Sequence, residues 1–133
     1  MNDMEVNEKK TPGKVFSIGE ENPPIPECTV SKAFGGGDSG ITYFSLAENT
    51  DISAEIYPYH KLLIVAEGSV EVYGNDGFSQ KLHAGECIFT WTDVPVGMRT
   101  TEGSVYTEVC VGKESRMNEI IKAGEIFKLE DLV

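Results

Sequence analysis

Several residue types are scarce in this chain, and each scarcity removes a class of site. There are three cysteines, an odd number without paired spacing, so neither a disulfide framework nor a zinc knuckle is expected. Such a use of cysteine is typical of a reducing, cytoplasmic setting. The two histidines, His60 and His83, are interpreted as surface or packing residues.

Basic residues are also few: 11 Lys and Arg stand against 22 Asp and Glu, giving a formal charge of −11. A surplus of this sign repels nucleic-acid phosphates and anionic lipids, so neither is expected as a partner. No run approaches the ~18 apolar residues of a membrane span. The first residues have no apolar centre, so they do not resemble a secretion signal. We therefore expect a cytoplasmic protein without a membrane partner.

Short β-rich segments separated by glycine and proline make up most of the chain. Turns are expected at Glu67-Gly68, Asn75-Asp76-Gly77 and His83-Ala84-Gly85, and Pro95-Val96-Gly97 is read as a further break. The segments predicted as strands are 41–46, 61–65, 69–73, 79–82, 87–91 and 104–111. Short strands at this spacing indicate an all-β sandwich or barrel.

The length of 133 residues fits one domain, expected over 11–133 and preceded by a disordered polar tail at 1–10. The Pro- and Gly-rich segment 11–30 is predicted to wrap a surface in extended form. The glycine-rich stretch 33–40 lacks the lysine of a phosphate-binding loop, so it is read as a turn between strands.

The two ends of the chain contain short segments of similar sequence. Gly13-Lys-Val-Phe-Ser-Ile18 is similar to Gly124-Glu-Ile-Phe-Lys-Leu129, which suggests comparable edge strands at both ends. They would pair with each other or across a dimer. The tail 117–133 is expected to give a strand, a turn and a short helical turn.

Two segments resemble the paired motifs of small cupins: Leu62-Leu-Ile-Val-Ala-Glu-Gly-Ser-Val-Glu-Val72 and Leu82-His-Ala-Gly-Glu-Cys-Ile-Phe-Thr-Trp-Thr-Asp-Val-Pro-Val-Gly-Met-Arg99. The resemblance covers about residues 40–112. It implies a double-stranded β-helix, or jelly-roll barrel, here with extended N- and C-terminal segments. The chain is similar to the ethanolamine-utilisation cupins, because its metal-binding histidines are replaced as theirs are.

The first cupin motif carries His-x-His, a spacer of three or four residues, and then Glu. Counting back from Gly68, the Glu position falls on Lys61. With the shorter spacer the two His positions fall on Tyr57 and Glu55, and with the longer one on Ile56 and Ala54. None of these positions keeps the metal ligand that the resemblance implies.

The second motif runs from Gly-Asp through an apolar strand and a proline turn to a final His. Counting from Gly85, the usual Pro and Gly become Trp91 and Asp93, and the final His becomes Val96. Cupin metals need imidazole and carboxylate donors; Val96 offers none, and Lys61 would place a cation beside a cation. We therefore expect neither a metal nor another cofactor.

Strand alternation over 55–61 would place Glu55, Tyr57, Tyr59 and Lys61 on one face and turn His60 away, although a bend at Pro58 would reset this parity. In this interpretation Lys61 pairs with Glu55 beside Tyr57. The predicted ligand pocket comprises Glu55, Tyr57, Tyr59, Lys61, Trp91 and Val96.

Three functional hypotheses follow. The first is a metal-free binding module for a small polar ligand, an acid or a sugar, without catalysis. The second is a metal-independent isomerase or epimerase, with Tyr57 and Lys61 as acid and base and Glu55 as a further candidate. The third is a metalloenzyme with shifted ligands, His60 and Glu55. A homodimer is expected in each case, because a half-exposed sheet edge needs cover.

Overall fold

The computed structural model describes residues 11–34, 40–74 and 77–132. The tail predicted at 1–10 lies outside these residues, as do most of the glycine-rich stretch and two residues of the predicted turn 75–77.

Strands dominate the described residues, which confirms the all-β prediction. The helical pieces are short: α1 (Ile18–Glu21), η3 (Arg116–Glu119) and η4 (Leu129–Leu132). In the described part of the chain, no helix has the length and apolar character needed to cross a membrane. The strands are β1 (Thr29–Phe34), β2 (Ile41–Leu46), β3 (Thr50–Ile56), β4 (His60–Gly74), β5 (Ser79–His83), β6 (Glu86–Phe89), β7 (Pro95–Thr100), β8 (Ser104–Val111) and β9 (Ile126–Lys128).

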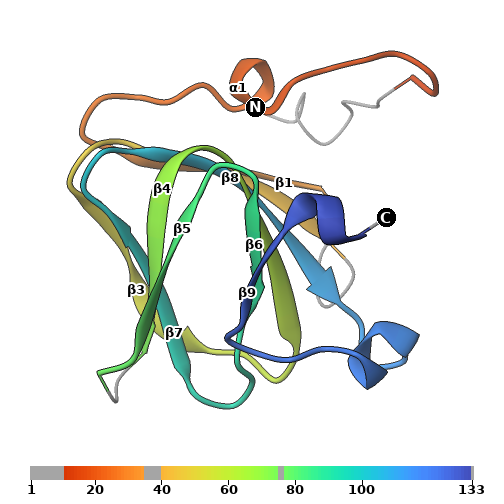
Figure 1. Cartoon of the computed structure of the whole chain (residues 1–133). Helices are drawn as coiled ribbons and strands as arrows, with labels where there is room; N and C mark the ends of the chain where they lie inside the picture. Colours follow the sequence, from red (N-terminus) through yellow and green to blue (C-terminus); the bar gives the residue numbers. More distant parts are fainter. Residues whose placement is uncertain (1–10, 35–39, 75–76, 133) are drawn as a thin grey trace.

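These strands form two facing sheets that close into a barrel (Figure 1). The first sheet has the order β1-β2-β8-β4-β6-β9, and in the second β3 pairs with β7, β7 with β4, and β4 with β5. All the pairings are antiparallel. Strand β4 belongs to both sheets, so it joins the two halves of the barrel.

The turn predicted at Glu67-Gly68 is wrong, because both residues lie within β4. The register of β4 against β8 shifts between Val65 and Glu67, and the strand passes here from the first sheet to the second. Gly68 has φ 69°, and a Cβ at this position would overlap the carbonyl oxygen of Gly103. Gly68, which was predicted as part of a turn, therefore lies at a β-bulge.

The break predicted at Pro95-Val96-Gly97 is also wrong, since these residues begin β7. Strand β7 pairs with β3 from Pro95 and with β4 from Val96, and proline is tolerated as the first residue of a strand. Val96 and Met98 of this strand join the barrel core. Burial between the two sheets outweighed the turn-forming character of Pro95 and Gly97.

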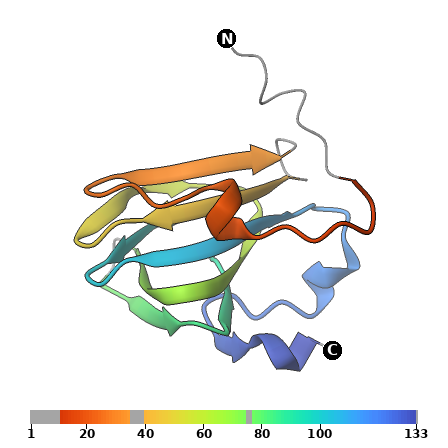
Figure 2. The ribbon, with the colours of Figure 1, turned by 90° about the horizontal axis from the view of Figure 1, so that it is seen from above.

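The N-terminal segment runs over the upper part of the barrel, across β1, β2 and β8 (Figure 2). It covers a surface as predicted for 11–30, but its extended course is interrupted by α1, and Thr29 already begins β1. Asn22 anchors it: its side-chain amide donates to the carbonyls of Val30 and Tyr43, and its carbonyl accepts from the Ser45 hydroxyl at 2.6 Å. The predicted edge strand over 13–18 does not form. At the other end β9 pairs with β6, and η4 follows it.

The barrel interior is apolar along most of its length. Its buried residues come from both sheets and meet between them. They are Leu46, Leu63, Val65, Val70, Val72, Leu82, Ile88, Val96, Met98 and Tyr106.

A glycine substitution series tests the bulge. Gly68→Ala places a methyl group against the Gly103 carbonyl and also strains a positive φ. Gly85→Ala is the matched control, because Gly85 has φ 88° with nothing within 4 Å of the new Cβ. We expect Gly85→Ala to lower the free energy of unfolding by about 1–2 kcal/mol. Gly68→Ala should cost a further 1–3 kcal/mol or so, measured by urea denaturation. Equal losses would contradict the role given to Gly68.

Candidate functional site

A charged pair lies inside the barrel among apolar side chains. Along the first half of β4, Lys61, Leu63 and Val65 are buried while their neighbours are half-buried, so these three point inward. On the neighbouring strand β8, Tyr106 and Glu108 are also buried. Lys61 Nζ lies 3.1 Å from Glu108 Oε1, with the two side chains 9% and 7% exposed.

The carboxylate of Glu108 is only partly satisfied by this contact. Burial raises its pKa, and the attraction to Lys61 counteracts part of that rise. Among the described residues no hydrogen-bond partner reaches its second oxygen, Oε2, or the hydroxyl of Tyr106. A buried acceptor without a donor costs free energy, so the pair leaves an open hydrogen-bonding position inside the barrel.

Tyr57 covers the ammonium group from the turn between β3 and β4. Its ring centroid lies 3.2 Å from Lys61 Nζ, a cation–π contact. Its hydroxyl points elsewhere and donates to Glu55 Oε1 at 3.0 Å, at the surface. Burial first, and then the hydrogen bond to Glu55, raise the pKa of Tyr57 to about 12. The phenol therefore keeps its proton at neutral pH.

Thr90 fixes the backbone that carries the lysine. The amide of Lys61 donates to Thr90 Oγ1 at 3.1 Å, and the amide of Thr90 donates to the carbonyl of Lys61 at 2.9 Å. His60 Nδ1 lies 2.7 Å from the carbonyl oxygen of Thr90. These contacts tie the start of β4 to the end of β6, so Lys61 is held by its main chain as well as by its ion pair.

The space left around this centre is small. A cavity of about 10 Å³ is lined by Tyr57, Lys61, Thr90, Val96, Met98 and Glu108. That volume is at the lower limit for one water molecule. The barrel is therefore closed in this conformation, with the tyrosine ring filling its mouth.

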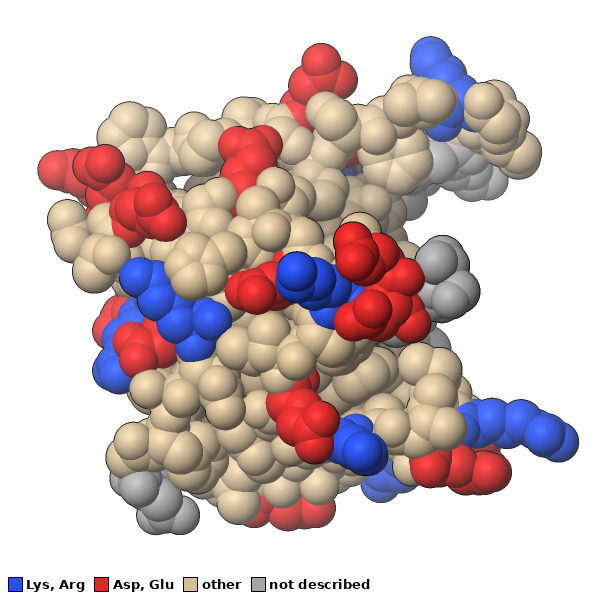
Figure 3. Space-filling model, viewed as in Figure 1, with Lys and Arg blue, Asp and Glu red and all other residues tan. Residues whose placement is uncertain are grey.

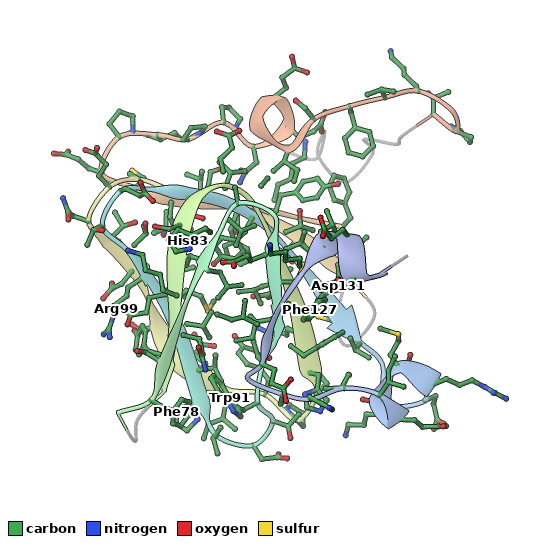
Figure 4. The ribbon with its side chains drawn as sticks, in the orientation of Figure 1. Phe78, His83, Trp91, Arg99, Phe127 and Asp131 are labelled. Atoms are coloured by element: carbon green, nitrogen blue, oxygen red, sulfur yellow. The ribbon has the colours of Figure 1, made fainter. Side chains whose placement is uncertain are left out.

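The structure brings three of the predicted pocket residues, Tyr57, Lys61 and Val96, around one cavity. Glu55 and Tyr59 lie beside it, since Glu55 accepts from Tyr57 and the rings of Tyr57 and Tyr59 are 5.8 Å apart. Trp91 does not line the cavity. It packs at 4.3 Å against Phe78 and close to Gly124, towards the lower end of the barrel (Figure 4).

The ion pair predicted between Lys61 and Glu55 is wrong, because Lys61 pairs with Glu108. The prediction treated residues 55–61 as one extended strand. In the structure β3 ends at Ile56 and β4 begins at His60, so the intervening turn breaks the alternation. Glu55 is exposed on β3, opposite Val96 of β7.

Glu108, Tyr106, Thr90 and Met98 were not identified from sequence. A signal for Glu108 was present, because it stands at alternate spacing with Tyr106 in a strand that carries no other charge. A charge at an inward position of such a strand needs a buried partner of opposite sign. Its pairing with Lys61 needs the register of β4 against β8, which sequence does not supply.

The residues present do not fit a metal ion of the kind that cupins bind. The centre offers one carboxylate, an ammonium group and the ring face of a tyrosine, while the remaining walls include Val96 and Met98. Across the described ranges, no three His, Cys, Asp or Glu side chains are grouped in a way that could hold a metal.

A wider hollow of about 840 Å³ lies at the end of the barrel beneath the N-terminal segment. Its lining includes the carboxylates Glu27, Glu48, Glu67 and Glu102, with Ile25 and flanking prolines on one side. Acidic side chains gather over this end at the upper left of Figure 3. The charge disfavours anions there.

Comparison with known proteins identifies the fold. No protein-family profile matches the chain, and no curated protein matches its sequence. Solved structures do match. A protein of unknown function from Streptococcus pyogenes has a TM-score of 0.72 at 21% identity, over 80% of this chain and 93% of the other. A cupin superfamily protein from Desulfitobacterium hafniense has a TM-score of 0.66 at 13% identity, covering 77% and 94%.

A third similar structure is a putative ethanolamine utilization protein from Salmonella typhimurium. It has a TM-score of 0.55 at 16% identity, over 64% of this chain and 70% of that chain. At these identities the likeness concerns the fold alone. The chain has the double-stranded β-helix fold of the cupin superfamily, which confirms the fold predicted from its two motifs.

Removing the lysine tests the buried pair. Lys61→Met leaves the Glu108 carboxylate buried without its counter-charge, so we expect a loss of about 3–5 kcal/mol in the free energy of unfolding. The double variant Lys61→Met/Glu108→Leu removes both charges and should recover most of that loss. Urea denaturation of the single and double variants provides the measurement. A double variant no more stable than Lys61→Met would contradict an energetic coupling.

The same variants carry a pH prediction. The pKa of Glu108 is raised in the folded state, so the fold gains stability from this group as the pH falls and loses it as the pH rises. Without Lys61 the opposing attraction is gone and the rise is larger. From pH 7 towards the ordinary value of 4.5, Lys61→Met should therefore regain stability relative to the wild type. A parallel pH dependence in the two proteins would contradict this assignment.

Proposed function

We propose that this chain is a metal-free small-molecule-binding module whose binding centre is the Lys61–Glu108 pair beneath Tyr57. The observation that carries the proposal is the buried, unpartnered Oε2 of Glu108, a residue that lines the cavity. A ligand that donates to this oxygen would relieve the cost of leaving it unpaired. The Lys61 ammonium supplies a complementary donor beside it.

Binding without catalysis is better supported than the isomerase alternative. The hydroxyl of Tyr57 donates to Glu55 and is directed away from the cavity, so an acid–base role would require a rotated side chain. The metalloenzyme alternative has less support, because His60 Nδ1 faces the carbonyl oxygen of Thr90 and the Glu55 carboxylate is engaged by Tyr57.

The three cysteines are free thiols, which supports the expected cytoplasmic setting.

A ligand screen tests this function. We expect a set of small acids, sugars and polyols to contain at least one compound that raises the melting temperature of the wild type. The same compound should leave the melting temperature of Lys61→Met/Glu108→Leu unchanged. Protein purified without chelator should contain no stoichiometric Fe, Mn, Zn or Ni by elemental analysis. A stoichiometric metal, or a ligand that binds the double variant equally well, would contradict the proposal.

We further propose a homodimer that forms through the outer face of the first sheet. Apolar side chains occupy facing positions from β1 to β6 and cross this face as one row. The row comprises Phe34, Ile41, Val109 and Leu62, and it ends at Phe89, which is buried and stacked against Phe127 of β9. Ile41 is 40% exposed, and a row of this kind is typical of a surface covered by a second copy.

The segments first considered for such an interface are engaged within the chain itself. The N-terminal segment is anchored to β1 and β2 by Asn22, and β9 pairs with β6 of the same chain. The row of apolar residues is therefore a better candidate for the interface than exchanged termini.

A matched pair of substitutions tests the interface. Ile41→Glu places a charge in the row, whereas Ile56→Glu places the same charge on β3, where the isoleucine is 62% exposed. By light scattering coupled to gel filtration, we expect the wild type and Ile56→Glu to be dimers and Ile41→Glu to be a monomer. A monomeric wild type, or a dimeric Ile41→Glu, would contradict the assignment.

A further inference from the structure

We propose that Tyr57 is a displaceable lid and that the ligand admitted beneath it is a small neutral polyol. This inference rests on the binding function proposed above and specifies its ligand class and its gate. It starts from a geometric conflict. Glu108, whose Oε2 has no partner, lines a cavity of only about 10 Å³, so no ligand larger than water fits unless a wall moves.

Tyr57 is the wall with the fewest attachments to the core. It lies in the turn between β3 and β4, is half-buried, and does not belong to the apolar core cluster. Its side chain is held by the contact with Lys61, by the neighbouring ring of Tyr59 and by a surface hydrogen bond to the exposed Glu55. By contrast, Val96 and Met98 are core residues of β7, and Thr90 is tied to the main chain of Lys61. Rotation of the phenol would expose Lys61 while the barrel stays intact.

The charge of the centre selects a neutral occupant. Lys61 and Glu108 already compensate each other at 3.1 Å, so a charged ligand would add an unpaired charge to an enclosed, poorly solvated space. An incoming anion would also face Glu108 inside and Glu55 at the mouth. A neutral molecule avoids both costs.

The hydrogen-bonding pattern selects hydroxyl groups. Glu108 Oε2 requires a donor, and the ammonium of Lys61 offers a donor to an oxygen acceptor once the ring has left it. A hydroxyl group can satisfy either partner, and adjacent hydroxyls can satisfy both. Val96 and Met98 give an apolar wall for the carbon chain. The space vacated by one phenol ring limits the ligand to the size of a short polyol.

The test uses a matched pair of probes, erythritol and its four-carbon carboxylate analogue erythronate. Each is titrated into the wild type and into Tyr57→Ala, and binding is followed through the backbone amide signals of Lys61 and Thr90. Tyr57→Ala removes the lid, so the Kd for erythritol should fall about tenfold or more. Tyr57→Phe keeps the ring over Lys61 but loses the Glu55 hydrogen bond, and its Kd should fall between the two.

Tyr59→Ala is the control for the loop, because it removes the ring beside Tyr57 without removing the ring that covers Lys61; its Kd should stay much closer to the wild-type value than to that of Tyr57→Ala. Lys61→Met/Glu108→Leu should bind neither probe. Tighter binding of erythronate, or no gain in Tyr57→Ala and Tyr57→Phe, would overturn this inference. If erythritol fails while another compound in the ligand screen requires the Lys61–Glu108 pair, the binding function stands and the polyol assignment is wrong.

Discussion

The ion pair between Lys61 and Glu108 is the constraint on which the interior of this barrel depends. Two charges are buried between sheets whose other core side chains are mostly apolar. Neither charge is tolerable without the other, since an isolated buried ion costs several kcal/mol or more. The pair forms only when β4 and β8 are adjacent in one register. It thus distinguishes the native pairing from a register slipped by one residue, which would turn one partner outward.

The pair also determines what surrounds it. Tyr57 lies over the ammonium, Thr90 holds the main chain of Lys61, and the position that the cupin resemblance assigns to a final histidine is the aliphatic Val96. In a metal-binding cupin, several protein ligands neutralise an ion supplied from solution. Here both charges are supplied by the chain, so the centre is complete as soon as the protein folds. The geometry leaves one oxygen of Glu108 unpaired, and both proposals for this site start from that oxygen.

Local chemistry in the sequence was enough to predict strands β2 and β8 with their correct bounds, and motif spacing was enough to place Lys61 at the centre. The failures occur where long-range contacts override local preference. Gly68 is a residue type common in turns but lies at a bulge, because β8 pairs with β4 up to Gly68 and β5 pairs with β4 from Ser69 onward. Pro95 is a strand breaker that begins a strand. Glu108 could not be identified from the sequence, because its partner Lys61 is 47 positions away in the chain. Only the strand register brings the two residues together.

The position of β8 in the first sheet has a consequence for how the chain folds during synthesis. This strand lies between β2 and β4, yet it is the last of the three to be synthesised. Until residues 104–111 leave the ribosome, β2 and β4 each have an unpaired edge, and Lys61 has no counter-charge. The nascent chain therefore cannot close the barrel before β8 has been synthesised. The dependence of the nascent chain on chaperones should be greatest while the edges of β2 and β4 are still unpaired.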